Sequence, residues 1–186
     1  MLAVHCAAAL VPYELSRKHH KVGFWLFLFA AQFLDILMLL LMNINFERVE
    51  SNYFNLNRFL SHGMPFAIMW TAFFGLLVFA ITKQLVIAGY CVALILFHEV
   101  CDHIIGFEHA LFDTDSTQIG FAFYSNAPIL GILIEALMCA VIVFWFCHRR
   151  AIKDVPVSLP SMLGLYLIFV GGALFMIPLI SQAYIS

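Results

Sequence analysis

The sequence predicts an all-α fold: a polytopic membrane helix bundle with five transmembrane helices plus a short N-terminal membrane helix. Of the 186 residues, 64% are apolar and 11% are charged, and the mean hydropathy is +0.99. A typical soluble domain is about 45–50% apolar and about 25% charged, so a water-soluble domain is excluded. Because about twenty residues make one span, we expect a single integral membrane domain over residues 1–186.

An apolar segment at about 1–13 opens the chain and is too short to cross a bilayer upright, so we expect a half-span or a tilted helix. No basic residue precedes it and no clear small-residue cleavage site follows it, which argues against a removable signal peptide. Five apolar runs long enough to cross come next, at 22–43, 62–82, 84–104, 127–147 and 160–182.

Basic residues in the connections predict the orientation. Seven of them fall on one side: Arg17, Lys18, Lys21, Lys83, Arg149, Arg150 and Lys153. The other side has two, Arg48 and Arg58. Because lysine and arginine concentrate in cytoplasmic loops, the long connections 44–61 and 105–126 should face the periplasm or exterior.

Cysteine spacing and net charge argue against three further classes of protein. The five cysteines fall mainly inside apolar runs and have no CxxC spacing, which argues against a disulfide framework and a thiolate metal cluster. The net charge is −2 and no basic stripe is interleaved with aromatic residues, so nucleic acid is not an expected partner.

Ionisable side chains interrupt the apolar runs, and on this topology all lie in the outer part of the bilayer: His5, Asp35, His62, His98, Glu99, Asp102 and Glu135. A charge at the centre of a transmembrane helix costs about 2.5–3.5 kcal/mol, so such residues are candidates for a functional site and normally face the bundle interior. The orientation rests on lysine and arginine alone, so this gathering is independent support for a single site.

His98 and Asp102 are four residues apart, which on a helix places them on one face about 6 Å apart. This spacing suits two ligands of one metal ion. Imidazole and carboxylate together fit zinc best, with manganese or ferrous iron as alternatives. A hydrogen-bonded pair that holds two helices together is the other interpretation of this spacing.

Three residues near the end of the fourth run have no clear assignment from sequence. His103, Glu108 and His109 could turn back toward the site and contact a second metal or a substrate, or they could be ordinary loop residues.

The order of these residues along the chain is more specific than any one of them. A histidine precedes an apolar segment, an aspartate lies late in the next span, a Ser-His pair opens another helix, and a histidine and aspartate follow at a spacing of four: Val4-His5-Cys6, Leu34-Asp35-Ile36, Ser61-His62, and His98 with Asp102. Over roughly residues 1–147 this order resembles small bacterial inner-membrane proteins described as membrane-bound metal-dependent hydrolases. It is also distantly similar to zinc-dependent phospholipase C.

The resemblance implies a metal-dependent hydrolase of the bacterial inner membrane that acts on a lipid phosphoester, with membrane lipid as its partner. The candidate metal ligands are His5, Asp35, His62, His98 and Asp102. Glu135 or Glu47 could act as a general base or orient a water molecule. A transporter of divalent metal or protons and a non-catalytic membrane subunit are the two alternatives, and the sequence leaves the oligomeric state open.

Overall fold

The computed structural model describes residues 2–16, 23–44, 51–106, 109–110, 118–121 and 123–177, and these residues are almost entirely helical. Two two-residue strands, β1 (His109–Ala110) and β2 (Gln118–Ile119), form an antiparallel pair. The helices are α1 (Leu2–Ala8), α2 (Leu10–Leu15), α3 (Phe24–Ala31), α4 (Phe33–Ile44), α5 (Ser51–His62), α6 (Met64–Thr82), α7 (Leu85–Ile104), α8 (Phe123–Asn126), α9 (Pro128–Ile152), α10 (Leu159–Tyr166), the π-helix η2 (Leu167–Gly171) and α11 (Gly172–Leu174).

Three helices in the described part of the chain are long and apolar enough to cross a membrane: α6, α7 and α9. Helices α3 and α4 add a fourth if they are counted as one broken span, because they meet at a bend of 61°. The segments Ala3–Leu15 and Leu159–Leu174 are apolar but shorter. An all-helical fold with apolar membrane-length helices is therefore confirmed in this coarse form.

Most predicted runs agree with the helices to within a few residues, with three main differences. The predicted run 22–43 is broken at Gln32 into α3 and α4. Helix α9 continues to Ile152, five residues beyond the predicted 127–147, because helical hydrogen bonding does not stop where the apolar run ends. The predicted connection 44–61 contains most of α5, whose sequence is too polar to be recognised as a span. Ser61 and His62, predicted to open the next helix, instead end α5, and α6 begins at Met64 after Gly63. The end of the predicted run 160–182 lies outside the described residues.

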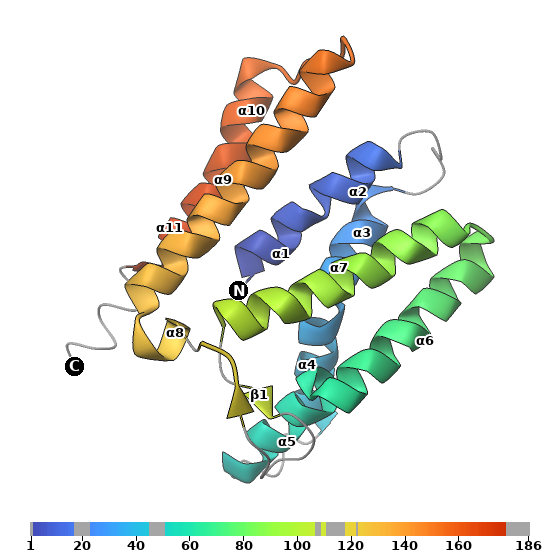
Figure 1. Cartoon of the computed structure of the whole chain (residues 1–186), viewed down its shortest axis with the longest axis vertical. Coiled ribbons are helices and arrows are strands. Elements are labelled where there is room, and N and C mark those ends of the chain that lie inside the picture. Colours follow the sequence, from blue (N-terminus) through green and yellow to red (C-terminus); the bar gives the residue numbers. More distant parts are fainter. Residues whose placement is uncertain are drawn as a thin grey trace.

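Two helical hairpins flank the N-terminal helices (Figure 1). Helices α6 and α7 form one hairpin through a tight turn, in which Lys83 adopts the left-handed conformation with φ 56°. Their axes approach closely at Gly75, where a Cβ atom would lie 2.6 Å from Val92 Cγ2. Helix α9 pairs with α10, η2 and α11 in the second hairpin. Helices α1 and α2 lie between α9 on one side and α3 and α7 on the other.

The buried face of α7 contains both core residues and the polar residues His98 and Asp102. Ala88, Cys91 and Ile95 are buried at successive turns, and His98 and Asp102 continue the same face toward the end of the helix. This spacing of three and four residues is the normal pattern of a buried helix face. The face that packs the core thus also carries His98 and Asp102 into the interior.

Candidate metal centre

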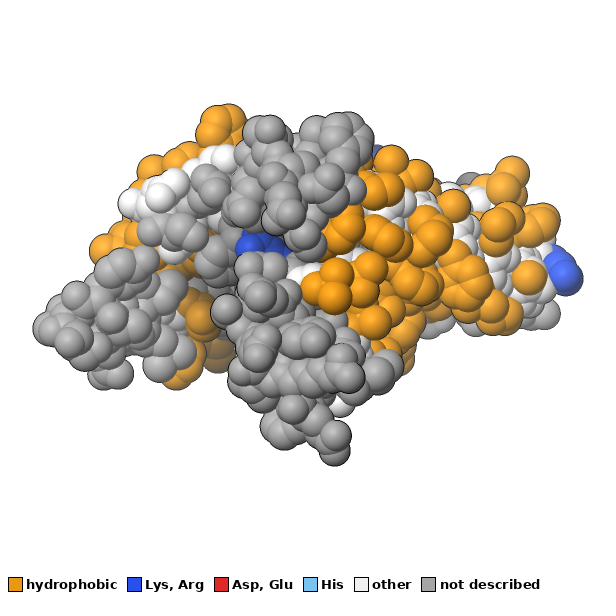
Figure 2. Space-filling view, turned by 90° about the horizontal axis from the view of Figure 1, so that it is seen from below, with side chains coloured by type: hydrophobic (Ala, Val, Ile, Leu, Met, Phe, Trp, Pro, Cys, Tyr) orange, Lys and Arg blue, Asp and Glu red, His pale blue; other side chains and the backbone are white. Residues whose placement is uncertain are grey.

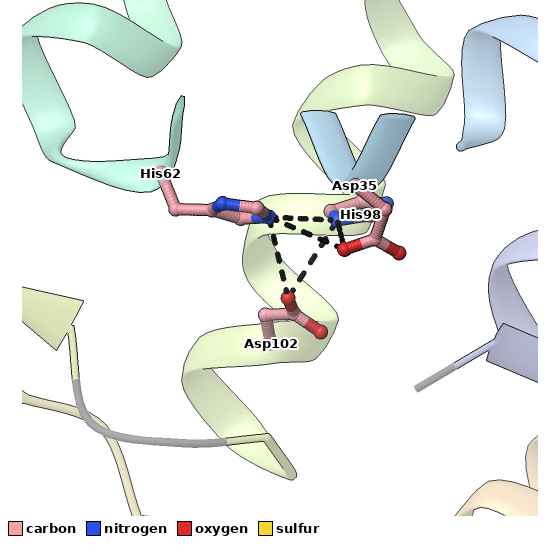
Figure 3. A group of neighbouring side chains, drawn as sticks. All are labelled: Asp35, His62, His98 and Asp102. Carbon is pink, nitrogen blue, oxygen red and sulfur yellow. Dashed lines mark hydrogen bonds and ion pairs between the residues drawn. The ribbon is translucent and has the colours of Figure 1, made fainter. Parts of the chain in front are cut away.

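Four side chains from three segments meet at the end of the bundle where α7 finishes (Figure 3). Asp35 comes from the first turn of α4, His62 from the last turn of α5, and His98 and Asp102 from α7. One possible ligand atom from each residue lies within 4.8 Å of all the others. Three of these residues are buried, and the Asp35 side chain is 34% exposed.

The break between α3 and α4 positions Asp35 and one of the histidines together. Gln32 interrupts the helix, and α4 resumes with Ile36 N–H donating to the Gln32 carbonyl. Asp35 therefore lies in the first turn of a new helix, where backbone dipoles favour a carboxylate. The Ala31 carbonyl, at the end of α3, accepts a hydrogen bond of 2.8 Å from His98 Nδ1.

This bond fixes the tautomer of His98. A carbonyl oxygen can only accept, so Nδ1 of His98 must carry a proton. In the neutral ring, Nε2 then has a lone pair, and it is Nε2 that faces His62 and the two aspartates. Metal-binding histidines commonly use their second ring nitrogen in this way.

His62 is fixed in the same tautomer by a two-step relay. The Ser61 hydroxyl donates to the Arg58 carbonyl at 3.1 Å, so its oxygen accepts from His62 Nδ1 at 2.7 Å. The lone pair of His62 Nε2 therefore points into the cluster. The two Nε2 atoms lie 3.4 Å apart, and two facing lone pairs repel each other unless a proton or a metal cation lies between them.

The distances between the ligand atoms fit a divalent cation. From His62 Nε2 the nearest oxygens are Asp35 Oδ1 at 3.5 Å and Asp102 Oδ2 at 3.9 Å. From His98 Nε2 the same two oxygens lie at 3.7 and 3.6 Å. A tetrahedral zinc ion with bonds of about 2.0–2.2 Å separates neighbouring ligand atoms by about 3.3–3.6 Å. The four residues therefore form a cluster that can hold a metal ion after small movements.

His5 lies against this group and uses different oxygens. Its Nδ1 is 3.8 Å from Asp35 Oδ2, and its Nε2 is 3.4 Å from Asp102 Oδ1. Its ring contacts the His98 ring in a tilted arrangement, with 3.7 Å between centroids and 31° between the ring planes. The sequence predicts His5 as a ligand alongside the other four. The structure brings all five residues together, with His5 next to the carboxylate oxygens that do not face His62 and His98.

The structure describes only one of the two predicted acid-base residues, Glu135. Glu135 is buried, and its oxygens accept hydrogen bonds from the Ala3 and Val4 N–H groups and from the Tyr124 hydroxyl. Its role as a general base stays a prediction. Glu47 lies outside the described residues.

The three unassigned residues after the fourth run are placed only in part. His103 Nδ1 donates to the Glu99 carbonyl at 2.8 Å and lies 3.8 Å from Glu99 Oε2. Glu108 and the side chain of His109 lie outside the described part of the chain.

Some contributors could not be assigned a role from sequence. In the sequence Ser61 is only part of a Ser-His pair, and nothing there indicates that it fixes the His62 tautomer. The Ala31 carbonyl carries no side-chain signal at all. Glu99 is adjacent to His98, and its Oε1 atom is buried with no hydrogen-bond partner among the described residues.

No protein-family model, curated protein or solved structure matches this chain. The functional assignment therefore depends on the chemistry of the cluster.

Proposed function

We propose that this chain is a membrane-embedded, metal-dependent hydrolase that acts on a lipid phosphoester. The observation that carries the proposal is the convergence of two histidine Nε2 lone pairs with one oxygen from each of two aspartates. Both lone pairs are fixed by hydrogen bonds on the opposite side of each ring. Such a donor set fits zinc best, with manganese or ferrous iron as alternatives.

A bound divalent ion would supply Lewis acidity toward a phosphoryl oxygen and would make water a stronger nucleophile at neutral pH. Asp35, His62, His98 and Asp102 would hold it. Asp35 is the most exposed of the four ligands, so the substrate would approach from its side. Glu135 and Glu47 remain the sequence-based candidates for a general base, and Glu99, whose Oε1 has no hydrogen-bond partner among the described residues, is a further candidate from the structure.

The lipid assignment is supported by the surface of α7, which carries His98 and Asp102, and of α6, which packs against it. Helices α6 and α7 expose large apolar side chains such as Ile68, Leu76 and Leu96. Figure 2, in which the molecule of Figure 1 is seen from below, shows hydrophobic side chains over much of the surface that is not grey. Acyl chains would contact such a surface, so a lipid could reach Asp35 laterally.

We further propose five transmembrane helices plus the N-terminal helix, in a bacterial inner membrane, with the site facing the periplasm or exterior. Lys83 follows the far end of α6, and Arg149, Arg150 and Lys153 lie at the far end of α9. These basic residues are separated from the metal cluster by the length of the helices, as expected for cytoplasmic ends.

A one-sided site is favoured over a transport path by the core below it. Along α7 the residues that precede His98 on the buried face are Ile95, Cys91 and Ala88, all part of an apolar cluster. Ions that cross a membrane need polar partners along their route. The buried residues of α7 that precede His98 are all apolar and do not provide such partners.

The test uses the full chain purified in detergent, with metal content measured by inductively coupled plasma mass spectrometry and hydrolysis measured on fluorogenic phospholipids. Wild type should carry near-stoichiometric metal and release product, and Asp35→Asn should lose both. Glu14→Gln, which changes a buried glutamate at the other end of the bundle, is the matched control and should retain both. A folded wild type without metal would refute the metal centre, whereas metal without hydrolysis of any phosphoester would refute the enzyme assignment alone.

A further inference from the structure

His5 of helix α1 lies beside the candidate metal site but is not one of the four clustered residues. His5 is 1% exposed, and neither ring nitrogen has a hydrogen-bond partner in the described structure. Each nitrogen instead faces a carboxylate, Nδ1 toward Asp35 and Nε2 toward Asp102. A buried polar ring without hydrogen bonds is costly, so its position must be imposed by the packing of α1.

The oxygens that face His5 are the ones that His62 and His98 do not approach most closely. Asp35 directs Oδ1 to the two Nε2 atoms and Oδ2 to His5, while Asp102 directs Oδ2 to them and Oδ1 to His5. His5 thus contacts the oxygens of both carboxylates that face away from the histidine pair, and its ring lies against the His98 ring at a tilt of 31°. In this position it restricts the rotation of both carboxylates and the orientation of His98.

The N-terminal end of α1 is held by a side chain from another helix. Glu135 of α9 accepts through Oε1 from the N–H groups of Ala3 at 3.0 Å and Val4 at 3.2 Å. First-turn N–H groups of a helix have no partner within the helix. A carboxylate at this end satisfies them and also interacts favourably with the helix dipole.

The second oxygen of Glu135 is tied back to the end of α7. The Tyr124 hydroxyl donates to Glu135 Oε2, and the Tyr124 N–H donates to the Ile105 carbonyl at 3.2 Å. Burial, and then the contact with Glu135, raises the pKa of Tyr124, so its hydroxyl keeps the proton that it donates. Ile105 directly follows α7, the helix that carries His98 and Asp102.

We propose that Glu135 is a positioning residue: it caps α1 from outside the helix and so holds His5 against Asp35 and Asp102. A closed chain of contacts runs from α7 through Tyr124 and Glu135 to α1, and returns through His5 to the ligands on α7. The proposal rests on the proposed metal site and assigns Glu135 a role in forming it. Proton transfer by Glu135 is the competing assignment.

The experiment loads the full-length protein in detergent with Co²⁺ and records its visible absorption, whose intensity and band positions report the ligand geometry. Affinity for Co²⁺ is measured by competition with a chelator. Glu135→Leu removes every hydrogen bond of the cap, Glu135→Gln retains an acceptor for the Ala3 and Val4 N–H groups, and Tyr124→Phe removes only the hydroxyl contact. Glu14→Gln is again the control.

The cap predicts a graded result. Glu135→Leu should weaken Co²⁺ binding by about 10–100-fold, the usual cost of losing an outer partner of a metal site, and should alter the spectrum. Tyr124→Phe should have a smaller effect, and Glu135→Gln should restore most of the affinity, the spectrum and the hydrolysis rate. His5→Ala should reproduce the altered spectrum of Glu135→Leu.

Three results separate the possibilities. If Glu135→Gln abolishes hydrolysis while its Co²⁺ spectrum is that of wild type, Glu135 transfers protons and the positioning role is overturned. If Tyr124→Phe and Glu135→Leu both bind Co²⁺ like wild type, the cap does not support the site. If wild type itself binds no Co²⁺, the failure belongs to the proposed metal centre. Should Glu135→Leu not fold, Tyr124→Phe and Glu135→Gln still decide between the roles.

Discussion

His98 donates its Nδ1 proton to the Ala31 carbonyl across a distance of 2.8 Å. The two residues are 67 positions apart in the sequence, and the bond joins the middle of a broken helix to the end of α7. It leaves His98 Nε2 with the lone pair that a metal ion requires. The bend at Gln32 and the ligand orientation on α7 are therefore parts of one arrangement.

Replacement of His98 by asparagine should separate the two uses of the ring. The asparagine amide can still donate near the position of Nδ1, but nothing replaces Nε2. We expect metal affinity to fall by at least about 100-fold, because losing a residue that only hydrogen-bonds to a metal ligand already costs up to about 100-fold. Unfolding of the metal-free protein should be close to that of metal-free wild type. Chelator competition and thermal unfolding in detergent test this, and retained metal affinity would remove His98 from the ligands.

Ser61 should matter for metal binding although it cannot reach the metal. Ser61→Ala deletes the oxygen that accepts from His62 Nδ1, so the ring can rotate or adopt the other tautomer. Affinity should fall by about 10–100-fold. Ser161→Ala, which deletes a serine hydroxyl bonded to Ser158 at the other end of the molecule, is the control and should bind metal like wild type. Equal affinity in both variants would contradict the relay.

Removal of metal should lower the unfolding temperature. A ligand present at a hundredfold excess over its dissociation constant stabilises the folded state by about 2.7 kcal/mol. For a chain of this size each kcal/mol corresponds to about 2–4 °C, so chelation should lower the transition by about 5–11 °C. The transition of Asp102→Asn should not respond to chelator. An equal response of this variant would mean that the chelator acts elsewhere.

The Glu14–Lys153 ion pair should stabilise the opposite end of the bundle without affecting the site. Glu14 is fully buried, and Lys153 Nζ lies 3.0 Å from its Oε1 with the lysine side chain 40% exposed. Lys153→Met should cost about 1–3 kcal/mol, between the values for surface and buried pairs. Adding Glu14→Leu should recover part of this loss. Unfolding in detergent measures the stability, and any change in metal content would show that the two ends are coupled.

The helices were largely predictable because each depends on a local run of apolar residues. The runs at 62–82 and 84–104 correspond closely to α6 and α7. The break at Gln32 was not predicted, since neither proline nor glycine marks it and the run 22–43 reads as continuous. The sequence predicts a connection where α5 lies, because the polar sequence of α5 lacks the hydrophobicity that identifies a span.

The candidate ligands could also be predicted from the sequence, because ionisable residues are rare in apolar runs of membrane proteins. Asp35, His62, His98 and Asp102 were all named, and the structure brings them within ligand distance of one another. What the sequence could not provide is how each is held. The Ala31 carbonyl, the Ser61 hydroxyl and the Glu135 cap act through contacts between distant segments.

The sequence alone thus determined the class of protein and the residue types of the centre, because composition and local periodicity fix which segments are apolar and helical. Only the tertiary structure decided which ring nitrogen of each histidine faces inward, which oxygen of each aspartate faces the histidine pair, and that His5 stands behind both carboxylates. Those choices depend on hydrogen bonds between side chains and backbone groups that are far apart in the chain. No local pattern encodes them, since they arise only when the helices pack.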